Sequence, residues 1–163
     1  MNEEHLSQTG DFIVRKATIA DLDIIMHHRR NMFLDMGHQD QAAISAMLLT
    51  SRAFFAERLE NGRFQEWLME TASNEVVAGG GLVVTDYLPS PTDPFPKRAV
   101  IVNMYTEHAY RRQGLARKLM LIMIAWCRNE GFGTVLLHAS PDGKPLYEQL
   151  GFKATNEMRL MLR

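Results

Sequence analysis

The chain has 163 residues, of which 46% are hydrophobic, and its formal net charge is −1. This length suits one domain with a sizeable core, and a charge near zero provides no positive field to attract nucleic acid or an anionic membrane. The single cysteine cannot form an intrachain disulfide, and the polar N-terminus has no secretion signal. We therefore expect one cytoplasmic domain, residues 1–163, in which residues 1–10 form a flexible tail.

The first half of the chain predicts one strand followed by two helices. Residues 12–16, FIVRK, have the composition of a short strand, and Thr18 with Asp21 resembles the start of a helix. The apolar residues that follow recur at close to 3.6 positions, which indicates an amphipathic helix up to about Gly37. A second helix is expected from about Gln41 to Leu59, because an Asn-Gly pair follows soon after.

The second half of the chain changes to strand patterns. Residues 64–71 and 75–84 are expected to form a hairpin, and the glycines Gly79 to Gly81 indicate a bulge or a close backbone contact in its second strand. The remaining elements, in chain order, are a proline-rich irregular loop over 86–98, a strand over 99–106, a helix ending near 130, a strand over 134–140, a helix over 144–150 and a final pair of strands from 152. This order predicts an α/β fold with one mixed sheet and helices on both faces.

The segment YRRQGLARKL, residues 110–119, joins an expected strand to the helix after it. The first turn of a helix has free N–H groups and the positive end of the helix dipole, which together favour a bound anion. Gly114 allows close approach, and Arg111, Arg112 and Arg117 add positive charge. The P-loop and dinucleotide-binding patterns are both absent. The segment therefore predicts either a phosphate site of another kind or a solvated helix start.

Two motifs, in this order, resemble the GNAT acetyltransferase superfamily. RRQGLA, residues 111–116, matches the [QR]-x-x-G-x-[GA] signature, and LYEQLGF, residues 146–152, is similar to the segment that follows the fifth strand of that family. Residues 15–21 look like the family's N-terminus, so the resemblance covers nearly the whole chain. It implies a mixed, mostly antiparallel sheet that is splayed between its fourth and fifth strands, and acetyl-CoA as the acyl donor.

The resemblance also implies which residues bind acetyl-CoA. Backbone groups at the end of the strand 99–106 would hold the pantetheine arm, and the N–H groups of the turn would hold the pyrophosphate. Many family members have an asparagine at one position where this chain has a serine, whose hydroxyl would replace it only in part. No metal is implied, and His27 and His28 diverge by about 100° on a helix. The implied cofactor-binding residues are Met104, Tyr105, Thr106, Arg111, Arg112, Gln113, Gly114, Leu115, Ala116, Arg117 and Ser140.

The catalytic residues implied by the resemblance are Tyr147 and Glu107. The phenol of Tyr147 would protonate the departing CoA thiolate, or else Tyr147 packs as a core aromatic. Glu107 follows the strand that faces the acyl group and would accept the proton of the amine, or else it is paired or solvated. His108, His138 and water are the other candidates for this base.

The expected function is transfer of an acetyl group from acetyl-CoA to a primary amine of a small molecule or peptide. A non-catalytic acyl-CoA sensor, and an acyltransferase that uses another acyl-CoA or an oxygen acceptor, share the same motifs. Arg29 and Arg30 either meet an acidic group on the acceptor or lie on a solvated face. No nucleic acid or membrane partner is expected, and a homodimer is left open as an alternative to a monomer.

The acceptor site is expected where two irregular segments, residues 35–41 and 86–97, lie near the acyl group, because loops on a rigid scaffold commonly determine specificity. The carboxylates of Asp35, Asp40 and Asp86 either offer negative charge to an ammonium group or serve as turn residues.

Overall fold

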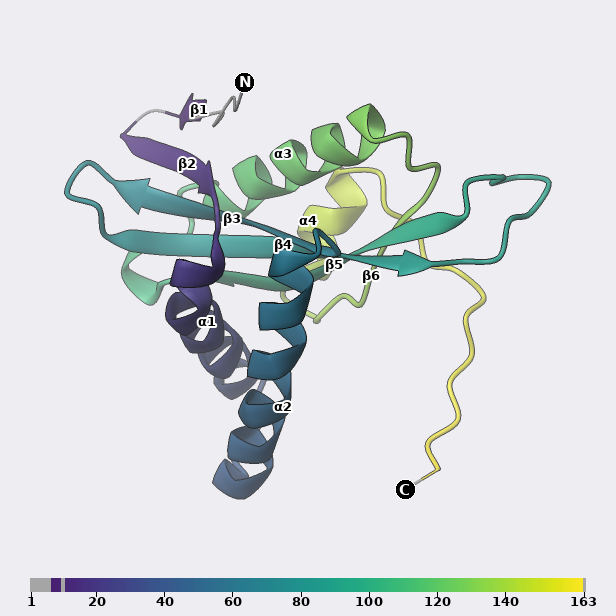
Figure 1. Ribbon diagram of the computed structural model, residues 1–163. Coiled ribbons are helices and arrows are strands. Elements are labelled where there is room, and N and C mark those ends of the chain that lie inside the picture. The colour runs from purple at the N-terminus through teal and green to yellow at the C-terminus, as the bar shows by residue number, and fades with distance from the viewer. Residues whose placement is uncertain (1–6, 10, 163) are drawn as a thin grey trace.

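The structure is a computed structural model that describes residues 7–9 and 11–162 (Figure 1). Its helices are Leu22–Asp35 (α1), Gln41–Glu60 (α2), Leu115–Asn129 (α3) and Lys144–Gln149 (α4), with short 3-10 helices at Ile19–Asp21 and His108–Tyr110. Its strands are Ser7–Thr9 (β1), Phe12–Lys16 (β2), Phe64–Thr71 (β3), Val76–Asp86 (β4), Lys97–Thr106 (β5) and Val135–Leu137 (β6).

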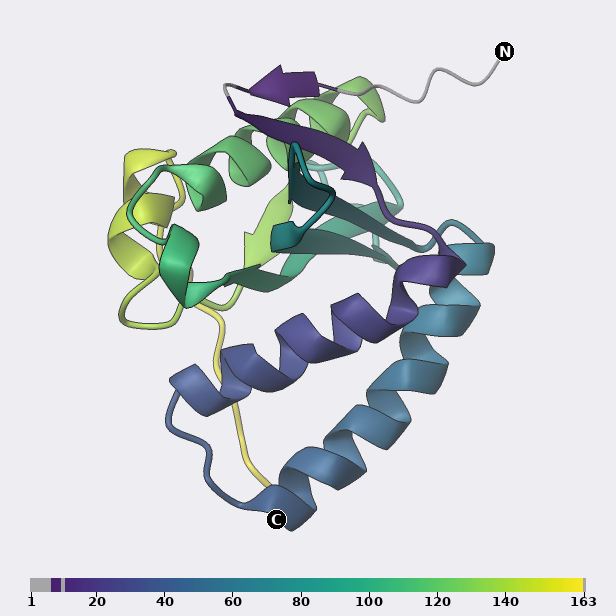
Figure 2. The same cartoon turned by 90° about the vertical axis from the view of Figure 1, so that its left-hand side faces the viewer.

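Within the described residues, the strands form one sheet in the order β1-β2-β3-β4-β5-β6. Neighbouring strands are antiparallel except for β5 and β6, which are parallel. Helices α1 and α2 lie on one face of this sheet, and α3 and α4 lie on the other (Figures 1 and 2). The expected mixed sheet with helices on both faces is therefore confirmed.

Each face of the sheet has its own apolar cluster. On the α3 side, Leu119, Met120 and Met123 are fully buried, because their spacing puts them on one face of the helix. On the other side, Ile25 of α1 and Phe55 of α2 pack against the sheet. Each such side chain stabilises the fold by roughly 1.5–3 kcal/mol through burial. None of the described helices is long and apolar enough to cross a membrane.

The three glycines of β4 make room for side chains that cross the strand. A Cβ at Gly79 would lie 2.7 Å from His28 Nδ1, and one at Gly81 would lie 2.6 Å from the ring of Phe64. A Cβ at Gly80 would overlap a methionine sulfur of β5. The pairing of β4 with β5 also changes register between Gly79 and Gly81, so the expected bulge and the expected close contact are both confirmed.

The prediction of a tail over residues 1–10 is wrong for part of that segment. Residues 1–6 and 10 lie outside the described residues, but Ser7–Thr9 forms β1 and pairs with β2, with Ser7 opposite Val14. This pairing satisfies backbone groups on the outer edge of β2. It depends on main-chain hydrogen bonds, which a polar composition does not exclude.

The final pair of strands expected from residue 152 is absent, because residues 152–162 have no regular secondary structure. Met158, Leu160 and Leu162 alternate as in a strand, but they are 93%, 80% and 87% exposed. The segment extends past the sheet on the side of α1 and α2 (Figures 1 and 2). Alternation predicts which way side chains would face, but it does not show that a neighbouring strand is available for pairing. The strand expected over 134–140 is also shorter, at Val135–Leu137.

Candidate active site

Strands β5 and β6 are paired along only part of their length. Their register runs from Ala99 opposite Val135 to Ile101 opposite Leu137, where β6 ends, while β5 continues to Thr106. The rest of β5 therefore has a neighbouring strand on the β4 side only. Because the unexpected strand β1 shifts the numbering by one, β5 and β6 are the fourth and fifth strands that were expected to splay apart. That prediction is confirmed.

A bulge at Asn103 marks the beginning of this opening. Asn103 has a φ of 60°, a left-handed conformation that asparagine tolerates better than most residues. Its Nδ2 donates to the Ile25 carbonyl at 3.3 Å and to Glu66 Oε1 at 3.4 Å, on the α1 side of the sheet. Val102 packs on that same side, whereas Met104 packs with the α3 cluster. Two successive side chains thus share one face, which a regular strand does not allow.

The backbone beyond the bulge directs polar groups to the open edge. The Glu107 N–H donates to the Val77 carbonyl of β4 at 2.8 Å. Because backbone groups alternate between the two edges of a strand, those of Thr106 and Met104, one and three positions earlier, face the opening. The Thr106 carbonyl accepts a hydrogen bond there from Arg111 Nε at 2.9 Å. The predicted contacts of a pantetheine arm require this orientation.

The turn before α3 has the properties of an anion site. Gly114 is the N-cap, with a φ of 79°, and no side chain caps the helix. Apart from its neighbours in the chain, no atom of the described residues lies within 4 Å of where its Cβ would be, so the space there is open. Arg112, with a φ of 65°, and Arg117 are exposed nearby. Free N–H groups, the helix dipole and two exposed guanidinium groups together favour a bound phosphate.

Arg111 differs from these exposed cations. Its guanidinium group pairs with Asp35 at the end of α1 and donates to the Thr106 carbonyl. His108 Nε2 lies 3.1 Å from the same Asp35 carboxylate. The side chain of Arg111 therefore links α1 to the end of β5, unlike the exposed side chains of Arg112 and Arg117.

Tyr147 lies on α4, on the α3 side of the sheet. Its ring packs against the same apolar cluster as Met104 and lies 6.1 Å from the ring of Phe152. The ring crosses Gly143, where a Cβ would lie 2.8 Å from Tyr147 Cε2. Ser140 closes this turn, because its hydroxyl accepts the Gly143 N–H at 3.2 Å. Burial raises the pKa of Tyr147, so the phenol is protonated at neutral pH. The ring is thus both packed and protonated, and the two interpretations made from the sequence do not exclude each other.

Glu107 is held by hydrogen bonds at the end of β5. Its Oε1 lies 2.8 Å from His27 Nε2, and its Oε2 accepts from the Tyr105 hydroxyl at 3.4 Å. The carboxylate therefore connects β5 to α1 and is not simply solvated. His108 and His138, the other candidates for the base, are exposed and each contacts a different carboxylate.

Sequence reasoning missed two buried titratable side chains, Glu66 and His28. Glu66 is 1% exposed, and burial raises its pKa to about 8 although a hydrogen bond from Asn103 opposes this. His28 is fully buried, and burial lowers its pKa to about 4. A sequence signal for Glu66 existed, because it alternates with the buried residues Phe64 and Leu68 on the face of β3 toward α1 and α2. Among the residues described, no group of three or more His, Cys, Asp or Glu side chains could hold a metal ion.

The carboxylates expected to attract an ammonium group are already engaged. Asp35 pairs with Arg111, and Asp86 pairs with Arg63 at 3.1 Å. Asp40 accepts two backbone N–H groups at the start of α2. Asp40 thus has a turn role, which was the alternative to acceptor binding, whereas the ion pairs of Asp35 and Asp86 were not expected.

The proline-rich loop packs against the connection between α3 and β6. Its Asp93 is buried and accepts the hydroxyl hydrogen of Thr134, and the ring of Phe95 lies 5.2 Å from that of Phe132. The loop leads into the paired beginning of β5, whereas the opening is at the other end of that strand. This position favours an anchoring role over the expected role as a wall of the acceptor site.

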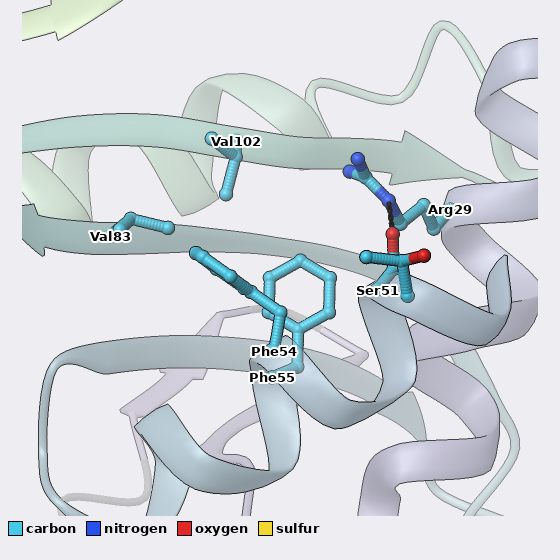
Figure 3. Close-up of a pocket in the computed structure, with 7 residues that line it drawn as sticks. Arg29, Ser51, Phe54, Phe55, Val83 and Val102 are labelled. Atoms are coloured by element: carbon cyan, nitrogen blue, oxygen red, sulfur yellow. Dashed lines mark hydrogen bonds between the residues drawn. The ribbon is translucent and has the colours of Figure 1, made fainter. Parts of the chain in front are cut away.

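A pocket of about 250 Å³ lies between the sheet and the helices α1 and α2 (Figure 3). Val102, the first residue of β5 beyond its pairing with β6, contributes to it. The pocket is therefore next to the opening, on the face opposite α3. Its walls are mainly apolar, with a cation and a hydroxyl at one end, and they include Phe54, Phe55, Val83, Val102, Arg29 and Ser51.

Comparison with known proteins gives a consistent result. Residues 28–152 match the acetyltransferase (GNAT) family. A GCN5-related N-acetyltransferase from Ralstonia eutropha JMP134 is 32% identical, with a TM-score of 0.87 over 93% of this chain and 98% of that one. A predicted acetyltransferase with acetyl-CoA from Clostridium acetobutylicum is 26% identical, with a TM-score of 0.84 over 92% and 95%. Human N-acetyltransferase 8 is 28% identical over 94 residues, which are 56% of this chain and 39% of the human protein.

Proposed function

The chain belongs to the acetyltransferase (GNAT) family, and on this basis we propose that it transfers an acetyl group from acetyl-CoA to a primary amine of a small molecule or peptide. The observation that carries the proposal is the opening between β5 and β6, followed along the chain by the uncapped N-terminus of α3. An unpaired strand edge can bind an extended arm through main-chain hydrogen bonds, and a free helix N-terminus can bind pyrophosphate.

The residues present fit acetyl-CoA. The open space at Gly114 and the exposed Arg112 and Arg117 suit its phosphates, which the backbone of residues 112–117 would hold. The outward-facing backbone of Met104 and Thr106 suits its amide-containing arm. When bound, acetyl-CoA supplies a thioester whose carbonyl carbon an amine can attack. Ser140 Oγ accepts the Gly143 N–H in the turn before α4, and its hydroxyl hydrogen could still be donated to the cofactor, so Ser140 stays in the proposed site.

The N–H of Met104 is the group that we assign to polarise the thioester carbonyl. It faces the opening, whereas Tyr105, two residues before Glu107, directs its own N–H toward β4. A backbone donor fixed in position stabilises the negative charge that develops on the carbonyl oxygen during attack. Holding amine and thioester together supplies much of the remaining acceleration, so no covalent enzyme intermediate is needed.

Tyr147 is the proposed general acid, and Glu107 is the proposed general base. Because burial raises the pKa of Tyr147, the phenol is protonated at neutral pH and has a proton to give to the departing thiolate. Glu107 accepts a proton from the acceptor ammonium, directly or through water, and His27 at 2.8 Å is placed to share it. The neutral amine attacks the carbonyl carbon, the C–S bond breaks, and the leaving thiolate takes the proton of Tyr147. The nitrogen, which is positively charged after attack, gives its proton to water, and the phenolate of Tyr147 regains one from water, so the net products are the amide, the CoA thiol and one proton.

The test of this proposal is the replacement of Gly114 by glutamate. A carboxylate at the helix N-terminus would occupy the open space and repel the pyrophosphate. Acetyl-CoA affinity should therefore fall at least about 100-fold, because the backbone donors of the site are fixed and cannot move away from the new charge. Isothermal titration calorimetry with acetyl-CoA measures the change. Thiol release across a panel of amines, amino acids and peptides then measures turnover.

Gly131→Glu is the matched control for this variant. Gly131 ends α3 with a φ of 81°, and it also has no neighbouring atom within 4 Å of its Cβ position. It therefore carries the same backbone strain and the same new charge, but at the other end of the helix. Equal acetyl-CoA affinity in both variants would contradict the phosphate site. Tight binding without thiol release from any acceptor would indicate an acyl-CoA sensor instead.

A further inference from the structure

Arg29 of α1 stands at one end of the pocket beside the opening. Its Nε donates to Ser51 Oγ at 2.8 Å and to Met47 Sδ at 3.2 Å, both of which are uncharged. Its guanidinium carbon lies 5.1 Å from the ring centre of Phe33 and 5.5 Å from that of Phe55. Its two terminal nitrogens are directed toward β5 (Figure 3).

The surroundings of Arg29 leave its charge without a counter-ion. In the part of the chain that the structure describes, no carboxylate forms an ion pair with it, whereas the half-buried Arg15 and Arg111 both pair with carboxylates. Burial lowers the pKa of Arg29, against a smaller opposing effect of Glu66. Glu66 itself is largely neutral at pH 7, because its pKa is raised to about 8. A half-buried cation with neutral neighbours is costly for the fold unless an anion binds there.

The chemistry of the pocket restricts the kind of acceptor that fits. Phe54, Phe55, Val83 and Val102 form an apolar wall, and no carboxylate among the described residues lines the pocket. A second ammonium group, as in a polyamine, would therefore meet a cation and no anion. A volume of about 250 Å³ lies just below the usual range of ligand pockets, so the pocket suits only a small molecule, such as an amino acid.

We propose that Arg29 binds the carboxylate of the acceptor, and that the acceptor is an amino-carboxylate with an apolar side chain, such as an apolar α-amino acid. The apolar side chain packs against the phenylalanines of α2, and the amine lies toward Val102 and the opening. This inference rests on the proposed function, because it assigns the substrate class of the same site. Arg29 is thus a specificity-determining residue and not a catalytic one.

The test compares acceptors that differ only in the carboxylate. Leucine, methionine and phenylalanine are each assayed beside their amides and their decarboxylated amines, with thiol release from acetyl-CoA as the readout. A charged hydrogen bond in a partly desolvated site predicts a kcat/KM at least about tenfold higher for the acids. The amides have the more readily deprotonated amines, so amine basicity alone predicts the opposite order.

Variants of Arg29 and its neighbour identify the source of the preference. Arg29→Gln should remove the advantage of the acids through a higher acceptor KM, while acetyl-CoA affinity is unchanged. Arg29→Lys keeps a charge but loses the fork geometry, so it should retain part of the advantage. Arg30→Gln is the matched control, because Arg30 is the exposed next residue on the helix, and it should retain all of it.

The outcomes separate this inference from the proposed function. Turnover of amines with no preference for the acids, or an equal loss for acids and amides in Arg29→Gln, overturns the role of Arg29 and leaves acetyl transfer standing. If no thiol is released with any acceptor, the proposal of acetyl transfer fails. Calorimetry with N-acetylleucine and its amide then tests whether the pocket binds a carboxylate through Arg29. Binding of the acid that Arg29→Gln abolishes supports the inference, and indifference to that variant overturns it. Thermal unfolding of each variant shows whether Arg29 acts only through stability, in which case acids and amides are affected alike.

Discussion

The buried residues Glu66 and His28 lie on the same face of the sheet, and burial changes their pKa values in opposite directions. The pKa of Glu66 rises from 4.5 to about 8, so its stabilising contribution is complete below pH 4.5 and is lost as the pH rises to 8. The pKa of His28 falls from 6.5 to about 4, so its contribution is complete above pH 6.5 and is lost as the pH falls to 4. Between pH 6.5 and 8, only Glu66 of this pair changes its protonation in the folded protein.

We predict that Glu66→Gln makes the stability less dependent on pH. Glutamine has the shape of the protonated carboxyl group, and Glu66 Oε2 has no hydrogen-bond partner among the described residues that the change would remove. The wild-type free energy of unfolding should fall relative to that of the variant as the pH rises from 6.5 to 8, because folded Glu66 still holds a proton there that the unfolded state has already released. Urea denaturation at several pH values measures the difference. A constant difference would mean that Glu66 is charged throughout this range.

We also predict that Tyr147→Phe separates chemistry from packing. The ring, its contact with Phe152 and its position across Gly143 are retained, so the melting temperature should change little. Removal of the acid should lower kcat by roughly 100-fold to 10,000-fold where protonation of the thiolate limits the rate. Tyr87→Phe, at an exposed tyrosine of the proline-rich loop, is the control. If the rate constant of acetyl transfer in a single-turnover experiment stays near the wild-type value, Tyr147 is only a core residue.

At the scale of elements, the sequence predicted the helices and the long strands well, because their apolar residues recur with a regular period. It failed where an element depends on an edge. β1 pairs through its backbone, and the alternating residues Met158 and Leu160 have no neighbouring strand, so periodicity contains no information about either case. The turn residues of the site were predicted from a motif. The ion pair between Arg111 and Asp35 was not predicted, because the two residues are distant in sequence and come together in the fold.

The glycines of β4 give a prediction at this scale. Gly81→Ala should destabilise the protein by about 1–3 kcal/mol, because its Cβ would meet the buried ring of Phe64, which has no room to move. Gly80→Ala should cost less, because the atoms in its way belong to flexible methionine side chains, Met104 and Met123. Urea denaturation of the two variants tests this order. The reverse order would show that the bulge opposite Gly80, and not the space beside Gly81, limits substitution.

At the scale of the whole molecule, the two proposed ligand-binding regions lie on opposite faces of the sheet. The proposed anion site at Gly114 and the phenol of Tyr147 lie on the α3 face, while the pocket with Arg29 lies on the α1–α2 face. Both lie beside the place where β5 leaves β6, so under our proposals a ligand on each face would reach the same strand edge. The bulge at Asn103 serves both, because it turns Val102 to one face and Met104 to the other.

The C-terminal segment lies outside this arrangement, which gives the last prediction. Beyond residue 152 its described side chains are exposed, and the ion pair between His138 and Glu157, 3.7 Å long, is also at the surface. A chain that ends at residue 153 should therefore keep its melting temperature within about 2 °C and keep its acetyl-CoA affinity. A chain that ends at residue 151 also loses Phe152, whose N–H donates to the Tyr147 carbonyl at 3.0 Å, and it should melt several degrees lower. Differential scanning calorimetry and size-exclusion chromatography compare the two. A large loss in the longer chain, or a change in its oligomeric state, would mean that Met158, Leu160 and Leu162 pair as a strand, within one chain or between two, and that the alternation had indicated a real partner.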